Sequence, residues 1–526
     1  MRRVDDWCER FGDSVNPILV KETRQALKSR QFVVTFSVLL FAALAWTVAG
    51  SMMMMPQIYT SPSAPRMLVG YYVVLAIPLL LVVPLAAYRS LEGEIDDGTL
   101  ELLTITALSP WQIVLGKLAS ATLQIGLYFV ALLPCVAYAY TLRGVDLPTT
   151  ALMIAILVVG ALLLTIIAIF FAPLARGRTG RVATLLAVIM ILMTAEYAIG
   201  AAVIYITLEG NPFTPADTLF IAISTLLIAV ALGHLFLTAT AAQLTPESEN
   251  RSTPIRLSLL MLTTVVIGVI AYAIQMPEED VSIGSYLVLS MSLAAVWTVC
   301  GSMMVAESPV MTPRIRRELP SSFLARSLLT WLTPGPATGL VFVTAVTILL
   351  SVLAIVGFEA VIELHGNSRI AARDRMLIQH VTMLYAGYFV GFLVCVRWIV
   401  AVVRLRNNPR VEIGLAAMVV VAVLLCIVPY SIGMHLNDYR SFDYSRWQIT
   451  NWAWTLVETV DGRFNRGDVY LIVSTSAAMF ATCLMLMTST VLPRRIATPG
   501  RVEEEQAKLP KNVADTGQSG QDQGTW

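Results

Sequence analysis

The chain has 526 residues, of which 57% are hydrophobic and only 13% are charged, and its formal net charge is +1. This is more apolar surface than a water-soluble fold of that length covers, so the composition excludes a soluble globular protein and predicts a polytopic membrane protein. The near-zero net charge gives no basis for a nucleic-acid partner.

A short amphipathic helix is predicted before the first apolar segment. Asn16 is a good N-cap and Pro17 suits the first helical position. Apolar residues are mixed there with Lys21, Arg24 and other basic residues, which favours a helix lying along the inner membrane face. The plainer alternative is a positively charged flank that only sets the orientation of the chain.

Twelve apolar segments are long enough to span a bilayer, which takes about 20 residues per helix. If the N-terminus lies inside, 27 of the 36 Lys and Arg residues fall on the inner side and 9 on the outer side. The sequence therefore predicts an all-α bundle of about 12 transmembrane helices, arranged as six plus six, with both termini in the cytoplasm. The predicted spans are 32–55, 68–88, 118–142, 150–174, 182–208, 216–241, 256–275, 283–306, 338–360, 377–402, 411–434 and 468–492.

A polar segment, residues 89–117, separates the second span from the third, and we call it the knob. Five acids lie between positions 92 and 101, and Gly98 interrupts them. A short helix is predicted to follow Gly98. A second helix begins with Ser109 as N-cap and Pro110 at its first position, and Gln112, three residues after the cap, completes a capping-box pattern. Acids on the predicted inner side oppose the usual basic bias, which favours a basic partner; the alternative is a solvated loop.

Two ionisable residues stand out inside the predicted spans, where a charge costs about 2.5 to 3.5 kcal/mol near the bilayer centre. Glu196 lies near the middle of the fifth span, and His234 of the sixth span is a candidate partner for it. They form either a polar point on a translocation path or a structural interhelical hydrogen bond, with a protonated glutamic acid as a further alternative.

No catalytic or metal site is predicted. The four histidines lack metal-ligand spacing, and the chain has no Gly-x-x-x-x-Gly-Lys-Ser/Thr loop for binding ATP.

The predicted domains are the amphipathic helix within 1–31, a six-helix unit at 32–241, a second six-helix unit at 242–492 and a disordered tail at 493–526. The second unit also carries a long inner loop after its second span, so it is a candidate degenerate repeat. Its loop is basic, with Arg314, Arg316, Arg317 and Arg326 in place of acids. The aromatic loop at 435–467 is expected to contain an interfacial helix, with a binding site as the alternative.

The knob resembles the cytoplasmic signature of the type-2 class of ABC exporter permeases, the ABC-2 permeases. That resemblance rests on Glu92, on Gly98-Thr-Leu-Glu-Leu, and on Leu108-Ser-Pro with Gly116-Lys117. The lead at 16–30, Asn-Pro-Ile-Leu-Val-Lys-Glu-x-Arg, is similar to the connecting helix of the same class and carries Glu22.

The resemblance covers residues 16 to about 240. It implies a permease in the bacterial inner membrane whose knob docks on a separate cytoplasmic ABC ATPase, which binds ATP and Mg²⁺ in the partner subunit and not in this chain. The implied coupling residues are Glu92, Gly98, Thr99, Leu100, Glu101, Leu102, Ser109, Pro110, Gly116 and Lys117. Three working units remain open, because the second set of spans lacks the Gly-Thr-Leu-Glu core: a homodimer of six-helix halves, a dimer of twelve-helix chains, or one chain acting alone.

Two other function classes stay open. A secondary transporter also suits twelve spans in a six-plus-six arrangement. A membrane anchor or assembly factor would use the knob to recruit a cytoplasmic partner without moving any substrate.

Overall fold

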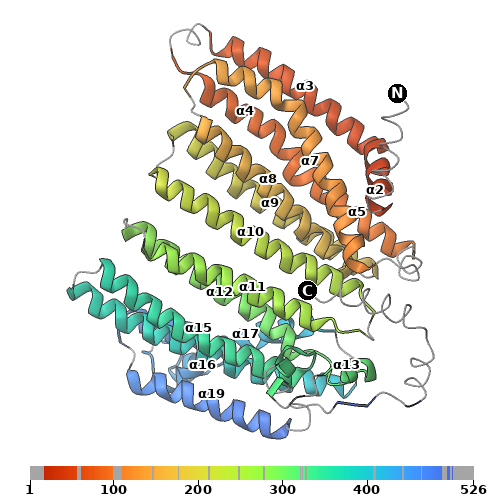
Figure 1. The fold of residues 1–526 in the computed structure, drawn as a ribbon. Coiled ribbons are helices and arrows are strands. Elements are labelled where there is room, and N and C mark those ends of the chain that lie inside the picture. The colour runs from red at the N-terminus through yellow and green to blue at the C-terminus, as the bar shows by residue number, and fades with distance from the viewer. Residues whose placement is uncertain are drawn as a thin grey trace. The chain divides into compact units, whose positions relative to one another are not determined.

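The computed structural model contains helices and no strand in the part of the chain that it describes (Figure 1). Twelve of these helices are long and apolar enough to cross a membrane, which confirms the predicted all-α polytopic bundle. The described residues are 17–55, 61–98, 109–144, 147–175, 177–210, 214–246, 249–275, 279–319, 322, 324–325, 329–365, 368–406, 410–440, 443–463, 465–487, 495–497 and 500.

The chain divides into two compact units, Met1–Thr245 with Pro254–Tyr272, and Pro246–Thr253 with Ala273–Trp526. Most of the seventh span therefore belongs to the first unit, although the domain boundary expected from the sequence lies at 242. The helices of the first unit are α2 Pro17–Lys28, α3 Arg30–Met53, α4 Ala64–Ala76, η2 Ile77–Val82, α5 Val83–Asp96, α7 Pro110–Thr141, α8 Leu147–Phe171, η3 Ala172–Leu174, α9 Gly177–Glu209, α10 Pro215–Leu244 and most of α11, Ser252–Ala273.

The amphipathic lead forms α2, a helix separate from the first span. Ser29 lies between them in an extended conformation, and its hydroxyl accepts a hydrogen bond from the Phe32 amide at 3.1 Å, which caps α3. Helix α2 packs against α7 and α3. Asn16, the expected cap of α2, lies outside the described residues.

The second span is a continuous helix of three segments, α4, η2 and α5. The middle segment, η2, is a π-helix that begins next to Pro78, and Pro84 stands at the start of α5. Proline has no N–H to donate, so the hydrogen-bond ladder changes here without ending the helix. The helix continues to Asp96, eight residues past the predicted end of the span at 88.

Helices α4 and α5 carry much of the buried core of the first unit, because they contact α7, α8 and α9. Three tyrosines, Tyr71, Tyr72 and Tyr88, are almost fully buried there. Small residues let neighbouring helices approach closely: the indole ring of Trp46 in α3 lies directly against Gly70 in α4.

In the second unit, α16 contacts α15, α17 and α19. The aromatic loop forms a short helix as expected, and the indole N–H of Trp452 donates to the Ala422 carbonyl at 2.9 Å. The basic loop contributes α13, while Arg326 lies outside the described residues. The helices of this unit are α12 Glu279–Val305, α13 Pro313–Glu318, η4 Thr330–Leu332, α15 Pro336–His365, α16 Ser368–Arg404, α17 Ile413–Leu436, η5 Arg446–Thr450, α18 Trp452–Val460 and α19 Arg466–Leu486.

Candidate functional site

The two described ends of the knob are well defined. Gly98 closes α5 with a positive φ of 67°, a left-handed conformation that glycine adopts at little cost. At the other end, the Ser109 hydroxyl accepts from the Gln112 amide at 3.3 Å, and the Gln112 side chain accepts from the Ser109 amide at 2.9 Å. This confirms the predicted capping box, with Pro110 as the first residue of α7. Thr99, Leu100, Glu101 and Leu102 lie outside the described residues.

Lys117 is buried, with a side chain only 2% exposed. Its ammonium nitrogen lies 3.2 Å from a carboxylate oxygen of Glu22 in α2 and 3.1 Å from one of Glu94 in α5. It also donates to the Ser90 hydroxyl at 2.8 Å. Gly116, the residue before it, is buried as well. Both residues of the Gly116-Lys117 pair therefore face the interior of the first unit and not a docking surface.

Two further interactions complete the arrangement. The Ser90 hydroxyl donates to Glu22 at 3.2 Å, and Lys21 pairs with Glu94 at 3.1 Å. We call Lys21, Glu22, Glu94 and Lys117 the charge cluster. It contains two cations and two carboxylates, so its formal charge is zero.

The charge cluster joins three helices that are far apart in the sequence. A buried ion pair adds little over apolar packing, but removing one partner strands a charge and costs about 3 to 5 kcal/mol. The cluster therefore specifies how α2 lies on α5 and α7, and a change in that arrangement would have to break or replace its ion pairs.

Other acids of the knob are also paired within the chain. Asp96 forms an ion pair with Arg181 of α9 at 2.6 Å. The Tyr88 hydroxyl donates to Glu92 at 3.3 Å and lies 3.1 Å from the Thr184 hydroxyl of α9. The sequence-based inference of a basic partner assumed that the acids of the knob are free to bind another protein. In the structure, Glu94 is paired with Lys21 and Lys117, and Asp96 is paired with Arg181.

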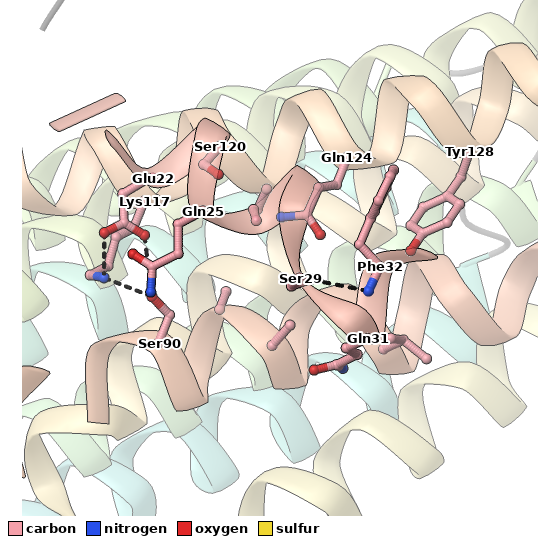
Figure 2. Close-up of a pocket in the computed structure, with 15 residues that line it drawn as sticks. Glu22, Gln25, Ser29, Gln31, Phe32, Ser90, Lys117, Ser120, Gln124 and Tyr128 are labelled. Atoms are coloured by element: carbon pink, nitrogen blue, oxygen red, sulfur yellow. Dashed lines mark hydrogen bonds and ion pairs between the residues drawn. The ribbon is translucent and has the colours of Figure 1, made fainter. Parts of the chain in front are cut away.

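A polar cavity of about 160 Å³ lies beside the charge cluster, between α2, α5 and α7 (Figure 2). Glu22, Lys117 and Ser90 lie at one end of it and Tyr128 at the other. Its remaining polar lining consists of Gln25, Ser29, Gln31, Ser120 and Gln124. The space is large enough for several water molecules, and amides and hydroxyls provide hydrogen bonds for them. The described residues include no group of His, Cys, Asp or Glu side chains able to hold a metal ion.

The structure does not pair Glu196 with its candidate partner His234 in the residues that it describes. Glu196 of α9 interacts electrostatically with Tyr72 of α4, while the His234 ring packs 5.7 Å from the Trp111 ring of α7. No hydrogen bond or ion pair joins the two in the described part of the chain. The reason is that α9 packs on α4 and α8, whereas α10 packs on α8 and α7. These two helices follow each other in the sequence, but each packs mainly against other helices.

Sequence reasoning missed Ser90 and the specific role of Glu94. Glu94 was recognised only as one of five acids, and Ser90 gives no signal of its own. The spacing of Ser90 and Glu94, four positions apart on one helix, places both on the face that meets Lys117.

Comparison of the chain with protein-family models, with curated proteins and with solved structures found no match in any of the three.

Proposed function

We propose that this chain is the membrane-spanning permease subunit of an ATP-driven exporter and that it couples ATP hydrolysis by a separate cytoplasmic ATPase to substrate movement. The observation that supports this most directly is the pair of contacts made by Lys117. It bridges Glu22 and Glu94. Two of the stretches on which the ABC-2 resemblance rests, the lead at 16–30 and the Gly116-Lys117 pair, therefore meet at one side chain, together with Glu94 of the knob.

The proposed mechanism uses the continuity of the knob with the spans. A force applied between positions 98 and 109 by a closing ATPase acts on α5 and α7, and each of these helices runs on into a membrane span. The charge cluster ties α2 to both, so α2 moves with them. ATP and Mg²⁺ are bound by the partner subunit, and this chain supplies positioning and conformational change.

The location follows from the same proposal. The excess of basic residues on one side supports a cytoplasmic position for the knob and both termini, and the ABC-2 resemblance implies a bacterial inner membrane. The first unit is then the permease unit, which works either as a homodimer or beside the second unit of the same chain.

The test is co-purification. The tagged full-length chain is extracted from native membranes in mild detergent, and retained proteins are identified by mass spectrometry and assayed for ATP turnover. We expect a soluble ATPase with a phosphate-binding loop to be retained by the wild type and lost with Glu101→Arg. Glu209→Arg is the matched control, because Glu209 is an exposed acid at the far end of α9 and on the predicted outer side.

The competing functions give different results. Retention of a partner that hydrolyses no ATP favours a membrane anchor. Substrate uptake driven by an ion gradient, with no ATPase retained, favours a secondary transporter. Equal loss of the ATPase with Glu101→Arg and Glu209→Arg would refute docking at the knob.

A further inference from the structure

A pair of arginines lies at the C-terminal end of α16 in the second unit. Arg404 is the last residue of this helix, and Arg397 lies two turns before it, on the same face. Neither residue has a role in the proposed coupling.

Arg404 is held by main-chain acceptors. Its Nη2 donates to the carbonyl oxygens of Ala306 at 2.6 Å and Glu307 at 2.8 Å, just beyond the end of α12. These contacts satisfy carbonyls at a helix C-terminus and fix the guanidinium group in place. The Nε of Arg404 is buried and has no acceptor within the described residues.

Arg397 is half-buried and is the less satisfied of the two. Its Nη1 is buried, and no acceptor for it occurs in the described part of the chain. The groups that act on it electrostatically are Arg404 and the Cys483 thiol of α19. Glu307 meets Arg404 through its main-chain carbonyl, whereas its carboxylate accepts from the Gly335 amide at 2.7 Å. Two adjacent cations with buried donors therefore lack a described carboxylate to neutralise them.

The depth of Arg397 indicates which anion can reach it. The span Asp374–Arg404 has 31 residues, so it is about 46 Å long, against a hydrocarbon core of about 30 Å. Its last turns therefore extend beyond the hydrocarbon if the helix is centred. Arg397, about 10 Å before the helix end, then lies near the boundary, where the long arginine side chain reaches the phosphate layer.

We propose that Arg397 and Arg404 bind the phosphate group of an anionic phospholipid at this end of the second unit. A phosphate offers acceptor oxygens that match the guanidinium fork, and its negative charge compensates two neighbouring cations. A membrane lipid is favoured over free phosphate because Arg397 belongs to a helix that is long and apolar enough to span the membrane. This site is independent of the proposed export function.

The test measures lipid retention by the purified full-length chain. Protein in a neutral detergent is mixed with equal amounts of phosphatidylglycerol and phosphatidylcholine, separated from unbound lipid, and analysed by mass spectrometry. We expect the wild type to retain an excess of phosphatidylglycerol and Arg397→Gln to lower that excess about fivefold. Arg406→Gln is the matched control, because Arg406 is exposed at the same helix end and loses the same charge. It should leave retention unchanged.

Two further measurements make the result decisive. Arg397→Lys keeps the charge but loses the fork, so it should lose most of the preference while unfolding at the wild-type temperature. Excess inorganic phosphate should not displace the lipid. If Arg397→Gln and Arg406→Gln lower the retained excess of phosphatidylglycerol equally, the attraction is a diffuse charge effect and the proposal is overturned. Full displacement of the lipid by inorganic phosphate would also overturn it.

Discussion

Lys117 of α7 and Glu22 of α2 are 95 positions apart in the sequence, yet their charged atoms lie 3.2 Å apart and both side chains are buried. Between them they fix the amphipathic helix α2 to the start of α7, which is long and apolar enough to span a membrane. The first prediction tests how much of the stability of the first unit depends on this contact.

Replacing Lys117 with methionine strands the Glu22 and Glu94 carboxylates, so we expect a loss of about 3 to 5 kcal/mol in the free energy of unfolding. Lys21→Met should cost less than about 1 kcal/mol, because that side chain is 56% exposed. Adding Glu22→Gln and Glu94→Gln to Lys117→Met should recover much of the loss. Denaturant titration in detergent measures all of these variants, and equal costs at Lys117 and Lys21 would contradict the buried cluster.

The capping box at the start of α7 gives a local prediction. Ser109→Ala removes the acceptor of the Gln112 amide and should cost about 1 kcal/mol. Hydrogen exchange should then accelerate in the first turn of α7 and remain unchanged at the start of α10. Thr214→Ala, which removes the side-chain cap of α10, should give the opposite pattern. Faster exchange at both sites in either variant would indicate general loosening and not loss of a cap.

Two adjacent tyrosines provide a matched comparison. The Tyr71 hydroxyl lies 2.7 Å from the Thr47 hydroxyl, whereas the buried Tyr72 hydroxyl has no hydrogen-bond partner in the described part of the chain. Tyr71→Phe should therefore cost about 1 kcal/mol, and Tyr72→Phe should be neutral or slightly stabilising. Thermal unfolding of the two variants decides this. A cost at Tyr72 equal to that at Tyr71 would mean that its hydroxyl finds an acceptor, with Glu196 the first candidate.

Helix packing in the first unit depends on Gly70. A Cβ there would overlap the Trp46 indole ring, whose N–H donates to the Met67 carbonyl at 3.2 Å. We expect Gly70→Ala to destabilise by about 1 to 3 kcal/mol through overpacking. Gly126→Ala in α7 is the control, because no atom lies within 4 Å of a Cβ built there. It should be neutral or stabilising, since alanine favours helix over glycine. Similar melting temperatures for both variants would refute the close approach of α3 and α4.

Hydropathy located the spans because each apolar run is about as long as a bilayer requires, or longer. The predicted span 411–434, for example, corresponds to α17, Ile413–Leu436. Hydropathy placed the end of the second span too early, at residue 88. Charged residues lower the hydropathy of a segment, but they do not end a helix. There the helix continues to Asp96, which pairs with Arg181.

The candidate site was only partly predictable, for a related reason. The local signals, a glycine at a helix end and the capping box at Ser109, depend on residues a few positions apart and were interpreted correctly. The burial of Lys117 depends on partners in two other helices, and its sequence neighbours contain no information about them. His234 shows the same limit, because its contact with Trp111 joins the sixth span to the third.

The π-helical segment at Ile77–Val82 has a consequence for the polar end of the same span. A π-helix accommodates an additional residue compared with a regular α-helix of the same length. A π-helical turn absorbs that additional residue locally, so deleting one residue within this segment would let a regular helix form with Ser90 and Glu94 still on the face that meets Lys117. The same deletion in the regular α-helix between this segment and Ser90 would turn every later residue by about 100° around the helix axis and point Ser90 and Glu94 away from Lys117. The span thus tolerates a change of length at one place in its apolar part and not at the next.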